Sequence, residues 1–149
     1  MQGVPAEQPT ELVAWANKLL EEARAARLGL VDDEGAPRVL PVTFAIAEGL
    51  IWSAIDQKPK RAEEPARLRF LRRDPRAALT VDRYSDDWDD LAWVQVLGRV
   101  SIVEVGEGGG GLDALSAKYV QYRERTPPGP LLALKPERYL WWRAVDPDR

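Results

Sequence analysis

The segment Leu50-Ile51-Trp52-Ser53-Ala54-Ile55-Asp56-Gln57-Lys58-Pro59-Lys60-Arg61 joins an apolar run to a basic turn. The apolar run is typical of a buried strand, and Pro59 predicts a turn directly after it. Lys58, Lys60 and Arg61 then stand where the next helix is expected to begin. Cations are unfavourable at a helix N-terminus unless an anion such as phosphate binds there. The segment therefore predicts a strand, a turn and a candidate phosphate site, with a solvated basic patch as the alternative.

Short strands are predicted on both sides of this segment. Residues 28–31, 38–45 and 50–55 are separated by turns at 32–35 and 48–49, which indicates two hairpins. Further strands are predicted over 76–83, 93–105, 131–134 and 139–145. Pro41 cannot donate a ladder hydrogen bond, so its strand needs an edge position or a bulge. Gly98, in the middle of the longest run, also indicates a bulge or a close backbone approach.

Three helices complete the pattern. Apolar residues recur at helical spacing over 11–23, and similar patterns cover 62–73 and 112–122. Pro65 is tolerated only in a first turn, so the second helix is expected to start near Glu63 or Glu64. Residues 108–111, four glycines in a row, are expected to form a flexible joint. The whole chain, 1–149, is therefore predicted to be a single mainly β domain with flanking helices, in which six or seven antiparallel strands close a small barrel.

Composition excludes several classes of partner. The net charge is −3, whereas general nucleic-acid binders need a basic surface. No apolar run approaches the roughly 20 residues of a membrane span. The N-terminal residues lack the basic start and apolar stretch of a signal peptide. We therefore expect a cytoplasmic protein that binds neither nucleic acid nor membrane.

The chain contains no cysteine and no histidine. Disulfides, Cys/His zinc sites and nucleophile systems that depend on histidine are therefore excluded. Four carboxylates lie within residues 86–90, but they lack the glycine turn and distal glutamate of a calcium loop, so we predict a solvated loop and no metal site. The absence of these groups favours chemistry that is carried by a bound organic cofactor.

Several segments, taken in order, resemble one known family. They are residues 35–44, 50–61, 68–79, 82–88 and 117–123, and the likeness extends over roughly residues 10–145. The chain resembles the pyridoxamine 5′-phosphate oxidase-like (PPOX class) split β-barrel family, whose fold is the FMN-binding split barrel. Within it, the chain is most similar to the actinobacterial branch of F420-dependent oxidoreductases. The sixteen arginines against five lysines also hint at a GC-rich bacterial genome.

The resemblance implies a homodimer with two identical cofactor sites across its interface. It places the cofactor phosphate beside Lys58, Lys60 and Arg61. Trp93 falls where relatives present a side chain to the ring from the neighbouring chain. Core packing for Trp52 and interface packing for Trp93 are the alternatives. The residues expected near the isoalloxazine or deazaflavin ring are Pro41, Val42, Thr43, Trp52, Ser53 and Ala54.

The chain departs from the oxidase itself at two points. Thr43 stands where that oxidase has a lysine, and the C-terminal Arg-x-His signature is missing because the chain has no histidine. Arg38 matches a position that binds phosphate in the oxidase. Oxidation of pyridoxamine phosphate is therefore not expected.

The resemblance implies hydride transfer between reduced coenzyme F420 and a small organic acceptor, with FMN in the same pocket as the alternative cofactor. A carrier that binds a flavin, a deazaflavin or a tetrapyrrole without catalysis is a second possibility. A dimeric structural or regulatory module, whose basic turn is only a solvated face, is a third. The sequence identifies no catalytic residue and no dedicated general acid.

Overall fold

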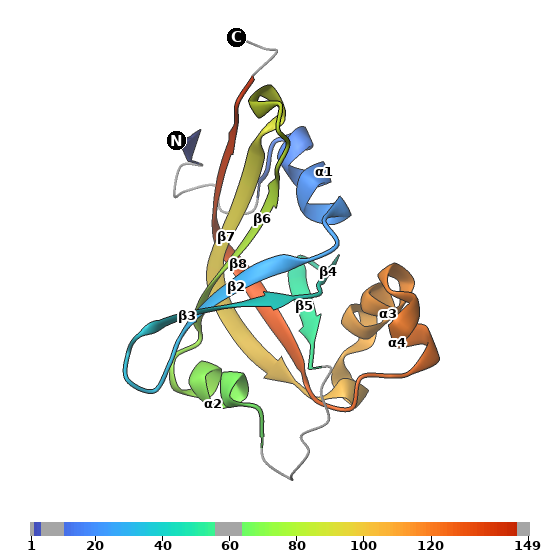
Figure 1. The fold of residues 1–149 in the computed structure, drawn as a ribbon. Coiled ribbons are helices and arrows are strands. Elements are labelled where there is room, and N and C mark those ends of the chain that lie inside the picture. The colour runs from blue at the N-terminus through green and yellow to red at the C-terminus, as the bar shows by residue number, and fades with distance from the viewer. Residues whose placement is uncertain (1, 4–10, 56–63, 146–149) are drawn as a thin grey trace.

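In the computed structural model, residues 2–3, 11–55 and 64–145 are described, so the basic turn with Lys58, Lys60 and Arg61 lies outside the described residues. Eight strands form one antiparallel sheet in the order β3-β2-β6-β7-β8-β5-β4, and β1 pairs with β8 (Figure 1). The predicted mainly β, antiparallel architecture is confirmed. The strands are β1 (Gln2–Gly3), β2 (Ala26–Val31), β3 (Pro37–Val42), β4 (Ala45–Ala47), β5 (Leu50–Ala54), β6 (Arg76–Arg83), β7 (Ala92–Val103) and β8 (Leu131–Arg143).

The first and last strands of this order are consecutive in the chain. The strand predicted over 38–45 ends at Val42, and only Thr43 and Phe44 separate β3 from β4. Three Cα steps span at most about 11 Å, so the two ends of the sheet must approach each other. The sheet is therefore curled into a barrel. Pro41 lies on the edge strand β3, as its missing N–H requires.

The long strands β7 and β8 pair antiparallel along their length. The register shifts between Leu97 and Gly98, which confirms the bulge predicted there. A Cβ on Gly98 would lie 2.9 Å from the carbonyl carbon of Lys135, so only glycine fits this approach. Pro136 pairs with Gly98. The prediction of two closing strands was wrong, because the bulge accommodates Pro136 within one continuous strand.

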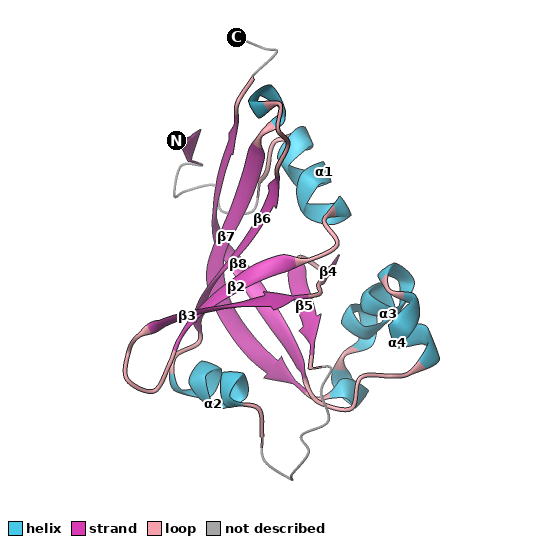
Figure 2. Ribbon diagram, in the orientation of Figure 1, coloured by secondary structure: helices cyan, strands magenta, loops and turns pink. Residues whose placement is uncertain are grey.

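The helices lie around the sheet (Figure 2) and are α1 (Ala14–Glu22), α2 (Ala66–Arg73), α3 (Gly109–Lys118) and α4 (Val120–Glu124). Single 3₁₀ turns occupy Trp88–Asp90 and Val105–Glu107. The helix α2 begins later than predicted because Pro65, with ψ of 137°, is extended and takes the N-cap position. Within the part of the chain that the structure describes, no helix is long and apolar enough to cross a membrane.

The glycine run is helical, which corrects the prediction of a flexible joint. Gly109 to Gly111 form the first turn of α3, and Gly111 is buried. The helix predicted over 112–122 is also interrupted, because Tyr119 adopts an extended conformation with φ −121° and ψ 116°. The two helices α3 and α4 therefore meet at Tyr119.

Two apolar clusters form the core. The larger cluster fills the barrel and includes Phe44, Val94 and Val96, against which α1 and α2 pack. The smaller cluster lies under α3 and α4 and includes Trp52 and Leu115. The strand β5 separates them, since Ile51 belongs to the first cluster and Trp52 to the second.

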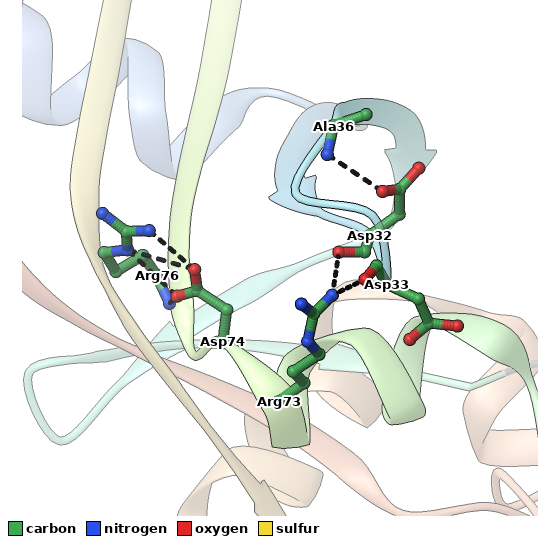
Figure 3. Close-up of polar contacts among 6 residues, drawn as sticks. All are labelled: Asp32, Asp33, Ala36, Arg73, Asp74 and Arg76. Carbon is green, nitrogen blue, oxygen red and sulfur yellow. Dashed lines mark hydrogen bonds and ion pairs between the residues drawn. The ribbon is translucent and has the colours of Figure 1, made fainter.

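Hydrogen bonds connect the turn between β2 and β3 to α2 (Figure 3). The Asp32 carboxylate accepts hydrogen bonds from the backbone N–H groups of Ala36 and Glu34, each at 2.9 Å. The bond from Ala36 is the main cause that lowers the pKa of Asp32. Arg73 donates to the backbone carbonyls of Asp32, at 3.0 Å, and Asp33. These bonds fix α2, the element that follows the basic turn in the chain.

Candidate functional site

A chain of polar groups links the β3–β4 connection to β5 and α4. The Ser53 hydroxyl donates to the Thr43 backbone carbonyl at 2.7 Å. The Thr43 hydroxyl lies 2.6 Å from the Tyr122 hydroxyl, and either oxygen can be the donor. Ser53 is buried with 6% exposure, so its bond to the backbone satisfies a group that water does not reach. The structure therefore brings together two of the predicted site residues, Thr43 and Ser53.

Tyr119 holds the same connection from its other side. Its hydroxyl accepts from the Phe44 backbone N–H at 3.1 Å, and it lies 2.9 Å from the Arg24 carbonyl and 3.1 Å from that of Phe44. The Tyr119 and Tyr122 rings meet edge to face, with centroids 5.7 Å apart. Tyr119 thus positions the backbone of Phe44, and Tyr122 the side chain of Thr43, where β3 passes into β4.

A pocket of about 360 Å³ opens beside the Thr43–Tyr122 pair. This volume is within the range of small-molecule sites. Gly129 directly follows Pro127 and Pro128 of the pocket wall, and a Cβ on it would lie 3.1 Å from Ile55. Ile55 is the residue that follows β5, so this wall of the pocket packs against the end of β5. The pocket therefore lies at the end of β5 from which the chain continues to Lys58. Its lining residues are Thr43, Tyr119, Gln121, Tyr122, Arg125, Thr126, Pro127 and Pro128.

Trp52 lies in the smaller core cluster and is only 4% exposed. Its indole N–H donates to the Ala47 carbonyl at 3.1 Å. The ring lies directly against Gly111, where a Cβ would be 2.5 Å from the Trp52 Cε2 and Cε3 atoms. Val42 and Ala54 are buried as well. This placement agrees with the core-packing alternative for Trp52, so a contact between its ring and a cofactor stays a prediction.

Pro41 and Trp93 lie on the outer face of the sheet. Trp93 pairs with Asp82 and Trp142, and Pro41 shares a cross-strand row with Arg27, Thr80 and Gln95. Residues in alternate positions of paired strands share a face. Trp93 and Pro41 are therefore not among the residues that line the pocket beside Thr43. An approach of Trp93 to a ring from a second chain stays a prediction.

The outer face also carries a shallow hollow of about 530 Å³. Its walls include Gly29 and Ala78, which have little or no side chain, and Val39, which is 70% exposed. Arg38 borders this hollow and lies 3.8 Å from the Asp32 carboxylate. The structure thus separates Arg38, which matches a phosphate-binding position in the oxidase, from the Thr43 pocket.

Sequence reasoning missed the roles of Tyr119, Tyr122 and Arg125. The two tyrosines are three residues apart, a spacing that places side chains near each other on a helix. That spacing could have indicated from the sequence that the two tyrosines act together. Their meeting with residues 43–44, which are more than 70 positions away in the chain, depends on the tertiary fold.

Of the four carboxylates within residues 86–90, that of Asp87 stabilises a turn. Asp87 caps the 3₁₀ turn by accepting from the Asp89 N–H at 3.1 Å, and the Asp87 N–H donates to the Ser85 hydroxyl at 3.1 Å. Within the described ranges, no group of three or more potential ligands lies close enough to hold a metal ion.

The pocket chemistry suits a flat heterocycle. The hydroxyls of Thr43 and Tyr122 can both donate and accept, which matches the carbonyl and N–H edge of such a ring. Arg125 and Gln121 add a cation and an amide at the pocket wall, and the tyrosine rings with Pro127 and Pro128 supply apolar surface. The described residues of the pocket therefore fit the binding of a flavin-like or deazaflavin-like ring better than the binding of a metal ion or catalysis by a nucleophilic side chain.

Comparison with known proteins relates the chain to one family and to several solved structures of the same fold. A family model described as pyridoxamine 5′-phosphate oxidase matches residues 13–143. No curated protein matches the chain. Similar solved structures include a conserved hypothetical protein from Mycobacterium tuberculosis, at 18% identity and a TM-score of 0.72, with 92% of this chain and 88% of that chain covered.

Two further structures have the same fold. One is a FAD-binding protein from Mesorhizobium loti, at 20% identity and a TM-score of 0.66, with 87% of this chain and 94% of that chain covered. The other is an F420 reductase, at 20% identity and a TM-score of 0.65, with 86% of this chain and 98% of that chain covered. At these identities the likeness concerns the fold.

Proposed function

The chain belongs to the pyridoxamine 5′-phosphate oxidase family, and from this membership we propose that it is an oxidoreductase that uses coenzyme F420. The reduced deazaflavin would supply a hydride to a small organic acceptor. The observation that carries the proposal is the pair of hydrogen-bonded hydroxyls of Thr43 and Tyr122 on the wall of a ligand-sized pocket. A cytoplasmic location is part of the same proposal, because the reduced coenzyme must be resupplied.

Two observations favour F420 over FMN. The chain has Thr43 where the oxidase has a lysine, so fewer cationic contacts are available there. One protein of the same fold is an F420 reductase. FMN in the same pocket is the second candidate, which the FAD-binding protein of the same fold supports.

The residues of this chain would bind and orient the coenzyme. Thr43 and Tyr122 would hold the polar edge of the ring, while Lys58, Lys60 and Arg61 would bind its phosphate. Charge-assisted hydrogen bonds of this kind contribute about 1.5–3 kcal/mol each. Tyr122, whose hydroxyl is hydrogen-bonded to that of Thr43, is a described group at the pocket that would hold a proton near the acceptor.

We also propose that two copies of the chain pair through the outer face of the sheet. Val39, Gly29 and Ala78 line a shallow, partly apolar hollow on this face, and Trp93 lies on the same face. An isologous contact there would present Trp93 of one copy to its partner. Sedimentation is expected to show a dimer at micromolar concentration, and a monomer would contradict this part of the proposal.

The cofactor assignment is tested by titrating the purified protein separately with F420 and with FMN, followed by fluorescence. We expect tighter binding of F420. The double variant Lys58→Ala/Lys60→Ala should weaken that binding at least tenfold, which corresponds to about 1.4 kcal/mol. The control is Lys18→Ala/Lys135→Ala, which removes the same charge from residues that do not line the pocket.

If Lys58→Ala/Lys60→Ala binds F420 with unchanged affinity, the proposed phosphate site at these lysines is wrong. Binding of neither coenzyme would overturn the function as a whole. Turnover with a panel of small acceptors then separates an enzyme from a carrier.

A further inference from the structure

Lys118 lies beside a second pocket, apart from the one at Thr43. Its ammonium nitrogen is 3.9 Å from the centroid of the Phe44 ring and 5.5 Å from that of Tyr119. The pocket has a volume of about 410 Å³ and shares no lining residue with the Thr43 pocket. The residues that line it are Glu21, Ala45, Ile46, Ala114, Ala117 and Lys118.

The surroundings of Lys118 contain one more cation and one carboxylate. From the α1 side, Arg24 donates to the Lys118 backbone carbonyl at 3.0 Å, and its guanidinium lies over the Tyr119 ring. Glu21, also from α1, accepts from Asn17 at 3.2 Å. The β4 segment contributes Ala45 and Ile46, which carry no charge. Among the described residues, no carboxylate forms an ion pair with Lys118.

Burial lowers the pKa of Lys118 to about 8, and the nearby positive charge of Arg24 is a second, smaller cause. Burial disfavours the charged form of an amine, and a neighbouring cation does the same. The ring contact with Phe44 acts in the opposite direction, because it favours the ammonium. The lower pKa means that a larger share of the amine is neutral, and hence nucleophilic, near neutral pH than for an ordinary lysine.

We propose that Lys118 is a site of Nε-acylation by small activated acyl donors of the acyl phosphate class. The neutral nitrogen attacks the acyl carbon, the N–C bond forms, and the C–O bond to phosphate breaks. Inorganic phosphate leaves with the bonding electron pair, and the nitrogen loses its proton to water or to Glu21. The pocket surface formed by Ala45, Ile46 and Ala114 can receive the short apolar acyl group.

The expected selectivity follows from the neutral fractions. At pH 7 the neutral fraction of an amine with a pKa of about 8 is roughly 200-fold larger than that of an ordinary lysine with a pKa of about 10.4. Nucleophilicity falls with pKa, and a Brønsted slope of about 0.4–0.5, as for thiols, removes about 12-fold of this advantage. Because the Phe44 contact favours the ammonium, about 20-fold is the upper limit of the rate advantage of Lys118 over an exposed lysine at pH 7. Near pH 9.5 the same calculation leaves the rates about equal.

The experiment treats the intact protein with acetyl phosphate and measures the rate of acetylation at each lysine by peptide mass spectrometry. Lys18 and Lys135 serve as internal references, since Lys18 is 73% exposed and Lys135 is exposed. We expect a preference for Lys118 of up to about 20-fold at pH 7, near equality at pH 9.5, and loss of the preference in urea. No preference at pH 7, or a preference that persists in urea, would overturn the proposal.

A pair of variants tests the electrostatic cause. Ala114 lies one turn before Lys118 on the same pocket wall. Ala114→Glu would place a carboxylate near the amine and should slow its acetylation relative to Ala114→Gln, which fills the pocket to the same extent but carries no charge. Equal rates in the two variants would count against the reasoning. Both outcomes are independent of F420 binding, so they are distinguishable from a failure of the proposed function.

Discussion

Substitution of Gly111 by alanine tests the packing of Trp52 under α3. Gly111 is in the first turn of the helix, and an added Cβ would lie 2.5 Å from two carbons of the Trp52 ring. The ring has little freedom to move because its N–H donates to Ala47 and the side chain is only 4% exposed. We therefore expect Gly111→Ala to destabilise the fold.

The magnitude combines three effects. Overpacking of a tight core costs about 1–3 kcal/mol. Displacement of the ring would also weaken its hydrogen bond, at a cost of about 1 kcal/mol. Alanine in place of glycine favours the helix by about 1 kcal/mol. With overpacking near its upper limit, because the obstacle is a fixed ring, the net loss in the free energy of unfolding is about 2–3 kcal/mol.

Urea denaturation followed by tryptophan fluorescence measures this loss. The matched control is Gly110→Ala in the same helix, where a Cβ would meet the end of the Glu48 side chain, which can swing away into solvent. That variant should be as stable as the parent or slightly more so. The double variant Gly111→Ala/Trp52→Leu should be more stable than the sum of the two single changes indicates, because leucine removes the obstructing ring.

Equal stability of Gly111→Ala and Gly110→Ala would refute the packing of Trp52 under α3. The ring would then be free of the helix, and the alternative in which Trp52 contacts a cofactor would gain support. An additive double variant would also argue against direct contact.

Two further predictions concern hydrogen bonds. Tyr119→Phe leaves the buried Phe44 N–H and the Arg24 carbonyl without this hydroxyl, so the free energy of unfolding should fall by about 1–3 kcal/mol in urea titrations; a change below about 0.5 kcal/mol would contradict the anchoring role. The side-chain hydrogen bond from Arg76 lowers the pKa of Asp74 to about 2, so its contribution to stability is present above about pH 4 and is lost as the pH falls toward 2. NMR titration should find that Arg76→Gln returns the Asp74 pKa toward its ordinary value, and an unchanged pKa would exclude this bond as the cause.

Local patterns predicted most of the elements correctly. Pro41 required an edge strand and Gly98 a bulge, and both are observed because backbone hydrogen bonding leaves few alternatives at those residue types. The prediction of a flexible joint at 108–111 was wrong. Glycine is unfavourable in a helix, so it predicts a loop, but here a close neighbour leaves no room for a side chain at Gly111. That neighbour is Trp52, which is more than 50 positions away in the chain.

The candidate site shows the same division. Thr43 and Ser53 were predicted and are joined through the Thr43 carbonyl, because they lie on segments that the nearby hairpin brings together. Tyr119, Tyr122 and Arg125 come from the far end of the chain, and no local pattern connects them with residue 43. Lys118 likewise acquires its environment only from α1 and the Phe44 ring.

The sequence by itself determined the antiparallel strands, the absence of cysteine and histidine chemistry, and the clustering of three cations within Lys58-Pro59-Lys60-Arg61. Alternation along a strand divides its side chains between two faces, but it does not say what covers each face. Only the tertiary structure decided that Trp52 lies beneath α3, that Trp93 lies on the outer face, and that Tyr122 and Tyr119 bond to Thr43 and Phe44. Curling of the sheet and packing of the last helices against it bring these distant residues together.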